Sequence, residues 1–101
     1  MIARIWHGRT RPEDYDAYTR FLEERAVPDY RSTPGFVRLS FLRRLTEEAG
    51  EFTLITWWES LEAIRAFAGD EIDRAKYYPE DSEFLLEFEE RVSHWEPFVE
   101  G

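Results

Sequence analysis

The chain has 101 residues with 22 acidic and 13 basic side chains, a formal net charge of −9 at pH 7, and no cysteine. The negative charge argues against nucleic acids and anionic membranes as partners, and the absence of cysteine excludes disulfides and thiolate chemistry. The length fits one domain over residues 1–101. Because the sequence contains neither an apolar leader nor a run of membrane length, we expect a cytoplasmic protein.

The first elements of the chain are predicted to be a strand and a helix. Residues 2–9 alternate between the two sides of a strand well enough to form one. Thr10 and Glu13 have the spacing of a capping box around Pro12, which predicts the start of a helix. Pro28 should end or kink this helix, because proline lacks the amide hydrogen that a helix needs.

The rest of the chain predicts a hairpin, short helices and a last strand. A turn joins the second strand to the third, and the serine after the third strand can cap the helix that follows. A glycine then stops that helix. The predicted elements are, in order, a strand over 36–45, a turn over 47–50, a strand over 52–59, a helix over 61–68 capped by Ser60 and stopped by Gly69, helical turns over 70–76 and 81–86, and a strand over 87–98.

The third predicted strand is apolar on both faces. Alternate residues of a strand point to opposite sides of a sheet, so Phe52, Leu54 and Trp58 share one face. Ile55 and Trp57 share the other face. Such a strand needs cover on both sides, and the few helices of so short a chain can cover only one of them. We therefore expect a second copy of the chain on the other face, in a homodimer.

The order of the predicted elements, β-α-β-β-α-β, is the split pattern of the ferredoxin-like fold. It predicts an α+β domain in which an antiparallel sheet carries both helices on one face, because right-handed crossovers place them there. The face without helices is the one that the second copy would cover.

Four features together resemble the antibiotic biosynthesis monooxygenase (ABM) family of dimeric α/β-barrel proteins. They are this order of elements, the length, the Trp58-Glu59-Ser60 junction and the LEAIRAFAGDEIDRA segment after it. The resemblance covers nearly the whole chain. It implies a homodimer whose two sheets form a barrel, with one ligand pocket per chain between sheet and helices. Some members oxidise polycyclic phenols with O₂ and no metal or flavin, and others bind and degrade haem.

The haem-degrading branch of the family has three marker residues. They are an Asn late in the first strand, a Trp in the helix after the junction, and a His that ligates haem shortly afterwards. By spacing from Ser60, this chain has Phe67 and Tyr77 at the last two positions, and it has His7 near the first. Because the haem ligand is replaced, we expect no bound cofactor and no metal. Tyrosine can ligate ferric haem, so haem binding stays open.

His7, Tyr77 and Tyr78 are the candidate catalytic residues. His7 shares its face of the first strand with Ala3 and Ile5, and it points into the pocket if the helices cover that face. A neutral imidazole can then take a proton from an acidic phenol, leaving the phenolate or carbanion that reacts with O₂. The two tyrosines precede a proline in a loop, where a hydroxyl can hydrogen-bond a substrate oxygen or donate a proton. The simpler alternatives are a histidine bonded to a neighbour and tyrosine rings that only pack.

Trp57 and Trp58 point to opposite faces, so we expect one of them in the substrate pocket, beside Phe67, and the other in the dimer barrel. The alternative is that both tryptophans belong to the core. Aromatic residues make up 17% of the chain, which favours a cleft for a flat, apolar ligand. His7 and His94 are expected to lie far apart in the sheet, so they do not predict a metal site.

The sequence therefore predicts an ABM-like homodimer that acts as a cofactor-independent monooxygenase on a small aromatic or polycyclic compound. The alternative is a non-catalytic homodimer that binds a small hydrophobic metabolite, or haem, for sensing or storage. Oxygen-dependent turnover supports the first hypothesis, whereas the second predicts saturable binding alone.

Overall fold

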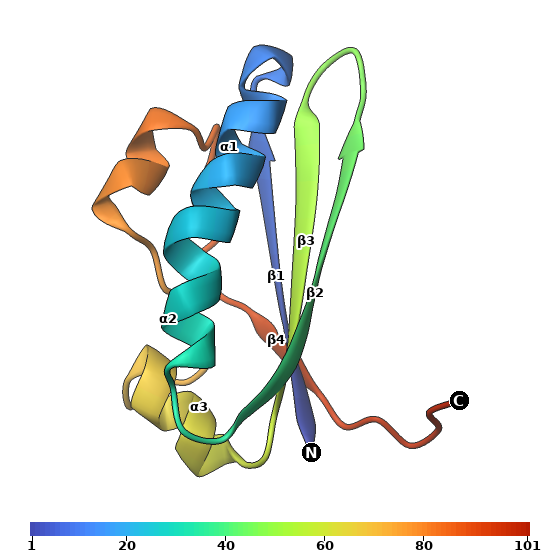
Figure 1. Ribbon diagram of the computed structural model, residues 1–101, viewed down its shortest axis with the longest axis vertical. Coiled ribbons are helices and arrows are strands. Elements are labelled where there is room, and N and C mark those ends of the chain that lie inside the picture. The colour runs from blue at the N-terminus through green and yellow to red at the C-terminus, as the bar shows by residue number, and fades with distance from the viewer.

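The computed structural model describes residues 1–101 and shows an α+β domain in two layers, with helices packed on one face of a four-stranded antiparallel sheet (Figure 1). The strands are β1 Ile2–Thr10, β2 Phe36–Leu45, β3 Gly50–Trp58 and β4 Ser93–Trp95. They lie in the order β2-β3-β1-β4, and every neighbouring pair is antiparallel. The predicted ferredoxin-like fold is confirmed.

The helical layer consists of a long helical rod and a short second helix. The rod combines a 3-10 turn at Pro12–Asp14, α1 at Tyr15–Phe21, a π-helical turn at Leu22–Ala26 and α2 at Val27–Arg31. Helix α3 spans Leu61–Ala68, and a further 3-10 turn spans Pro79–Glu83. None of these helices combines the length and the apolar character needed to cross a membrane.

The rod begins at Pro12 as predicted, but its cap and its proline behave differently from the prediction. Thr10 is the last residue of β1, and its hydroxyl donates to the Arg11 carbonyl instead of capping the helix. Pro28 does not end the rod, since helix continues to Arg31. The π-helical turn before the proline widens the helix, which makes room for a ring that would otherwise clash with the carbonyl four residues earlier.

Helix α3 begins and ends as predicted. The Ser60 Oγ accepts the Ala63 N–H at 3.2 Å, and Gly69 adopts φ +93° while its N–H donates to the Arg65 carbonyl at 2.8 Å. A second glycine, Gly35, has φ +88° in the loop before β2. A Cβ at that position would lie 2.3 Å from the Ala63 Cβ, so only glycine lets this loop touch α3.

The C-terminal third departs most from the prediction. The helical turn expected over 70–76 is absent, and the strand expected over 87–98 is reduced to the three residues of β4. The two segments pair with each other through Ala75 N–H to the Glu90 carbonyl at 2.9 Å and Val92 N–H to the Asp73 carbonyl at 2.7 Å. These backbone groups are thus unavailable for a helix. The helical turn expected over 81–86 is present slightly earlier, as the 3-10 turn described above.

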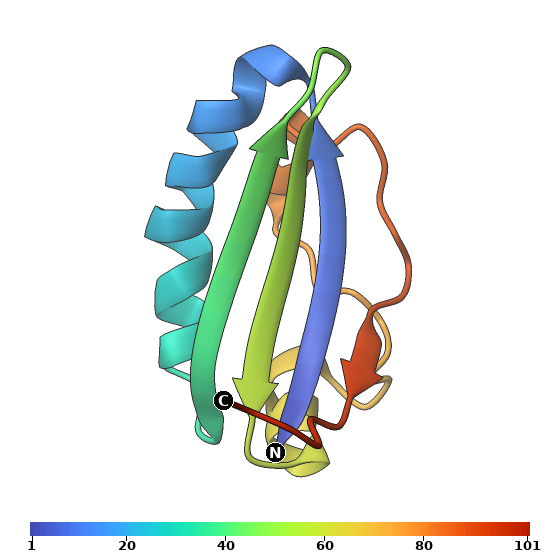
Figure 2. The ribbon, with the colours of Figure 1, turned by 90° about the vertical axis from the view of Figure 1, so that its right-hand side faces the viewer.

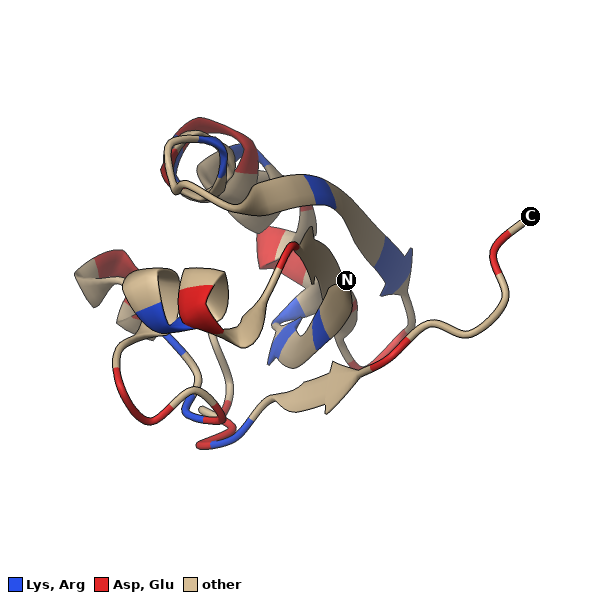
Figure 3. Cartoon of the chain, turned by 90° about the horizontal axis from the view of Figure 1, so that it is seen from below, with Lys and Arg blue, Asp and Glu red and all other residues tan.

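The sheet has one face covered by helices and one open face, which points toward the viewer in Figure 2. Strand β1 pairs Trp6 with Leu54, and this pair is buried under the helical layer. The next pair, Ile5 with Ile55, points the other way, onto the open face. Seen from below in Figure 3, charged residues lie on β2 and on the helices, and none lies on β4.

Trp57 and Trp58 separate as strand alternation requires. Trp58 is completely buried on the covered face, where it packs with Phe67 of α3 and donates its indole N–H to the Thr56 hydroxyl at 2.8 Å. Trp57 lies on the open face, with the Arg38 guanidinium 3.7 Å from its ring centroid. The covered-face tryptophan is therefore Trp58.

Candidate functional site

A small cavity lies between the helical rod and the covered face of the sheet, and we call it the helix-side cavity. Strand β1 contributes Arg4 and Trp6 to its wall, the rod contributes Tyr30, and α3 contributes Phe67. Its free volume is about 20 Å³, enough for about one water molecule. A larger ligand can enter only if side chains at its rim move.

Aromatic rings form much of this wall. Tyr30 stacks on Phe67 with ring centroids 4.5 Å apart, and Trp58 packs behind Phe67 at 5.3 Å. Tyr18 lines the cavity from the rod, with its ring 5.0 Å from that of Phe52. Burial raises the pKa of Tyr30 to about 12, so this phenol is neutral at pH 7. The arrangement suits a flat, apolar ring system.

Arg4 is the buried cation of the cavity, with only 4% of its surface exposed. Its Nη1 donates to the Ile72 carbonyl and contacts His94 Nε2 at 3.1 Å, while its Nη2 donates to the Arg74 carbonyl at 2.9 Å. Burial lowers the pKa of Arg4, because desolvation penalises the charged form. Guanidinium groups nevertheless stay protonated in proteins, so Arg4 brings a positive charge to the cavity wall.

His94 connects Arg4 to a carboxylate on the surface. A guanidinium can only donate hydrogen bonds, so His94 Nε2 is the acceptor and the ring proton is on Nδ1. Nδ1 then donates to Asp73 Oδ1 at 2.9 Å. Burial of the ring lowers the pKa of His94 from its usual 6.5, which keeps the imidazole neutral at pH 7.

Asp81 is the one carboxylate in the wall of the cavity, and it is 3% exposed. Its Oδ1 accepts the Tyr18 hydroxyl at 3.0 Å, and its Oδ2 accepts the Tyr78 backbone N–H at 2.6 Å. Desolvation raises the pKa of Asp81. Asp81 is the third residue of the 3-10 turn Pro79–Glu83, and this bond to the N–H of Tyr78, the residue before the turn, holds the local backbone in place. A buried carboxylate of this kind can accept a proton from a bound ligand.

The rim of the cavity is a cluster around Asp29. Its Oδ2 accepts hydrogen bonds from the Tyr78 hydroxyl and from Lys76 Nζ, the latter at 3.0 Å. Lys76 Nζ also lies 4.2 Å from the centroid of the Phe67 ring. Desolvation raises the pKa of Tyr78, so its hydroxyl acts as a neutral hydrogen-bond donor. Because Lys76 is exposed and Tyr78 is half-buried, these are the side chains that can move to admit a ligand.

The structure brings only some of the predicted site residues together. Tyr78 and Phe67 line the helix-side cavity, and Trp58 packs directly behind Phe67. His7 lies on the open face with Trp57, because strand alternation turns it away from the covered face. The helices do not cover the face of β1 that His7 occupies, so His7 does not point into the helix-side cavity.

Tyr77 also lies outside the helix-side cavity. Its hydroxyl accepts the Trp6 indole N–H at 3.2 Å and donates to the Glu89 carbonyl at 2.6 Å. Lys76, one residue earlier, is the group of this segment that reaches over Phe67. The donor set does not fit a haem group: no histidine lines the cavity, and the tyrosine suggested as a ligand is engaged elsewhere. No cluster of three His, Asp or Glu side chains is arranged to hold a metal ion.

The two buried charged residues of the cavity, Arg4 and Asp81, are among those that the sequence analysis missed. Arg4 shares its face of the strand with Ile2 and Trp6, and an arginine on an otherwise apolar strand face is a signal of a buried charge. Asp81 gives no such signal, because it stands in an acidic stretch that resembles any solvated loop.

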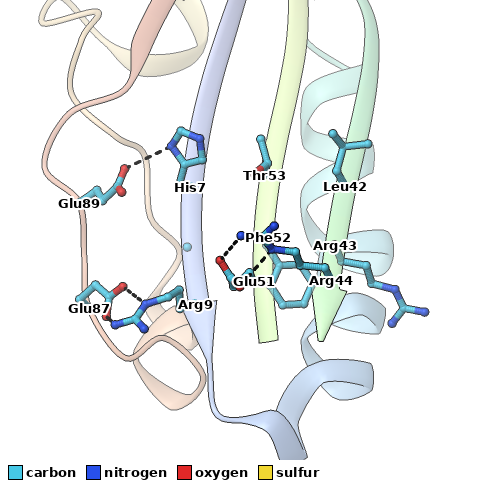
Figure 4. A pocket seen from close by; sticks show the side chains of 11 residues that line it. His7, Arg9, Leu42, Arg43, Arg44, Glu51, Phe52, Thr53, Glu87 and Glu89 are labelled. Atoms are coloured by element: carbon cyan, nitrogen blue, oxygen red, sulfur yellow. Dashed lines mark hydrogen bonds and ion pairs between the residues drawn. The ribbon is translucent and has the colours of Figure 1, made fainter. Parts of the chain in front are cut away.

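A second hollow, of about 620 Å³, lies on the open face beside His7, Thr53 and Leu42 (Figure 4). Charged side chains dominate its wall, where Arg9 pairs with Glu87 at 2.7 Å and Arg44 with Glu51 at 3.1 Å, and His7 Nδ1 lies 3.8 Å from Glu89 Oε2. Only two of its eleven lining residues are hydrophobic. The helix-side cavity is therefore the better candidate for an apolar ligand, despite its smaller volume.

Two solved structures share this fold. A mutant of MhuD, crystallised with two manganese protoporphyrin IX bound per active site, has 18% sequence identity and a TM-score of 0.63, over 100% of this chain and 98% of that chain. SnoaB, described as a cofactor-independent oxygenase from Streptomyces nogalater, has 16% identity and a TM-score of 0.60, over 98% of this chain and 94% of that chain. Identities this low show the fold alone. Among curated proteins, no sequence matches this chain.

The family comparison is more specific. Residues 1–72 match the family described as antibiotic biosynthesis monooxygenase (ABM). The matched stretch contains β1, the helical rod, β2, β3 and α3, which supply most of the cavity wall, and it leaves out the rim residues after 72. Because this is more than two thirds of its length, the chain belongs to the antibiotic biosynthesis monooxygenase family.

Proposed function

We propose that this protein is a homodimer that binds a small, flat aromatic compound in the helix-side cavity and oxidises it with O₂, without a metal or flavin. The proposal is carried by the cavity, whose aromatic wall from Tyr30 and Phe67 also contains a buried carboxylate, Asp81, and a buried cation, Arg4. Membership of the ABM family supports it. So does the likeness to SnoaB, which is described as a cofactor-independent oxygenase.

The proposed chemistry needs a proton acceptor, a hydrogen-bond donor and a site that excludes water. Removing a proton from an acidic phenol or an activated ring carbon leaves an anion that gives electrons to O₂. For a ring methylene the balance is R₂CH₂ + O₂ → R₂C=O + H₂O, so the substrate supplies all the electrons and no external reductant enters. We assign the acceptor role to Asp81 and the donor role to Tyr78, because both line the cavity; the Tyr78 hydroxyl would exchange its bond to Asp29 for one to the substrate.

Oxygen uptake and product formation with a panel of polycyclic phenols, run with and without O₂, test this function. Removing a general base costs about 10²- to 10⁴-fold in rate, so Asp81→Asn should lower kcat by that order and Tyr78→Phe by less. His7→Ala should leave kcat unchanged, because His7 lies on the open face. Loss of turnover in His7→Ala alone would move the acceptor to the open face. The absence of any oxygen-dependent product would overturn the oxygenase proposal.

A second function, ligand binding without turnover, is favoured by one observation. Both oxygens of Asp81 already accept hydrogen bonds, from the Tyr18 hydroxyl and the Tyr78 N–H, which weakens the carboxylate as a base. This alternative predicts saturable binding of the same aromatic compounds with no oxygen consumption. Recovery of unchanged ligand from a saturated, aerobic sample would support it over the oxygenase.

The open face supports the homodimer. Ile5 and Ile55 lie at its centre, Leu42 is 52% exposed and Trp95 is 58% exposed. Exposed apolar side chains gathered on one face of a sheet can mark an interface between proteins. We assign a second copy as the partner, because the charges at the end of this face already pair within the chain and leave the apolar centre as the available contact surface.

A further inference from the structure

We infer that Arg4 binds an anionic oxygen, a carboxylate or phenolate, on the planar aromatic ligand of the helix-side cavity. This inference rests on the proposed ligand site and goes beyond it by naming the chemical group that the site recognises. It starts from a cation that is 4% exposed and lines a cavity, yet has no carboxylate among its hydrogen-bond partners.

Such an arrangement is unusual, since a buried charge is normally paired with an opposite one. The partners of Arg4 are two backbone carbonyls and a neutral imidazole. The carboxylate of Asp73 is reached only indirectly, through His94. A ligand anion in the cavity would supply the direct counter-charge that the protein lacks.

The guanidinium also has donors to spare. It carries five N–H groups, and the three hydrogen bonds engage only Nη1 and Nη2, so Nε–H and one further N–H are without a protein acceptor. Since no fully enclosed polar side-chain atom lacks a partner, Nε is not fully enclosed by protein atoms, and Arg4 lines the helix-side cavity. Nε and Nη2 of an arginine together suit a carboxylate: in both Arg9 and Arg44 these two nitrogens donate to the two oxygens of one glutamate.

The hydrogen bonds that Arg4 already makes are compatible with ligand binding. The two carbonyls that Arg4 binds, those of Ile72 and Arg74, belong to the same irregular segment as Lys76, whose side chain lies at the rim and can move to admit a ligand. A ligand anion would bind the N–H groups that have no protein acceptor, and its opposite charge would attract the guanidinium directly. The chain's net charge of −9 does not prevent this, because exposed charges are screened beyond about 8 Å in physiological salt.

The test compares two ligands of the same shape, 2-naphthoate and 2-naphthamide, by calorimetric titration at neutral pH. Wild-type protein should bind the carboxylate at least tenfold more tightly, which corresponds to about 1.4 kcal/mol. Arg4→Met should abolish this preference while keeping the affinity for the amide. Arg20→Met, which removes an equal charge from the exposed side of α1, should keep the preference. If Arg4→Met does not fold, Arg4→Lys replaces it and should reduce the preference, because lysine lacks the planar fork.

The outcomes separate this inference from the proposed function. Equal affinity of wild-type protein for the two ligands overturns the role of Arg4 and leaves the ligand site standing. Binding of neither ligand overturns both the site and the inference. A full preference for naphthoate in folded Arg4→Met or Arg4→Lys protein also overturns the inference, since the anion would then be recognised elsewhere.

Discussion

Replacing Leu42 by serine should weaken the proposed homodimer without weakening the fold of the single chain. Leu42 lies on the open face of β2, opposite Thr53, and 52% of its surface is exposed. In the dimer this exposed half would be removed from water. In the single chain the serine leaves no buried cavity, because the leucine is already half in solvent.

The size of the effect follows from the exposure. Complete burial of a leucine side chain contributes about 1.5–3 kcal/mol, so burying the exposed half contributes about 0.8–1.5 kcal/mol. A twofold dimer contains the residue twice, which doubles the loss to about 1.6–3 kcal/mol. Since about 1.4 kcal/mol corresponds to a factor of ten, the dissociation constant should rise roughly 15- to 150-fold.

Sedimentation equilibrium over a dilution series measures this constant directly. Leu61→Ser is the matched control: it makes the same chemical change at a residue that is 43% exposed on α3, on the helical side of the sheet. It should leave the dissociation constant unchanged. A wild-type protein that stays monomeric at tens of micromolar, or equal constants for the two variants, would refute the assignment of the open face.

Three further predictions concern stability. Because the pKa of His94 lies below its usual 6.5, its contribution to stability is present above pH 6.5 and is lost as pH falls through the lower folded value. His94→Gln should therefore make the free energy of unfolding in urea depend less on pH over this range. An unchanged pH dependence would contradict the buried neutral ring. Gly35→Ala and Gly69→Ala both force alanine to positive φ, but the added Cβ would clash with Ala63 only at Gly35. The Gly35 variant should therefore lose about 1–3 kcal/mol more in the free energy of unfolding, and equal losses would show that the contact is unimportant. Tyr18→Phe removes a hydrogen bond to the buried Asp81 carboxylate and should cost about 1.5–3 kcal/mol in the same measurement, with no change of slope against urea.

Periodicity and local capping were enough to predict the fold. The alternation in β3 assigns Trp58 and Trp57 to opposite faces, and the serine before α3 and the glycine after it mark its ends. These signals are local, so a single sequence contains them. The absent helical turn over 70–76 depends instead on pairing with residues 90–92, a contact between distant segments that no local pattern encodes.

The site was harder to predict than the fold, for the same reason. His7 is polar and late in its strand, which suggests a catalytic base, but only the register with β3 decides which face it occupies. Tyr77 and Tyr78 are neighbours with equal chemistry, but only Tyr78 lines the cavity, whereas the Tyr77 hydroxyl bonds Trp6 and the Glu89 carbonyl. Arg4 was missed, although a charge on an apolar strand face is a signal in the sequence, and its free donors became apparent only with its partners in place.

The alternation of β1 also separates the residues proposed for dimer assembly from those that line the cavity, within one short strand. Odd-numbered positions such as Ile5 and His7 lie on the surface proposed for assembly, and even-numbered positions such as Arg4 and Trp6 lie on the wall of the cavity. Point substitutions can therefore change ligand preference while keeping the oligomer, or the reverse. A single-residue insertion in this strand would exchange the two sets at once, so we expect relatives to vary freely by substitution here and to avoid insertions and deletions.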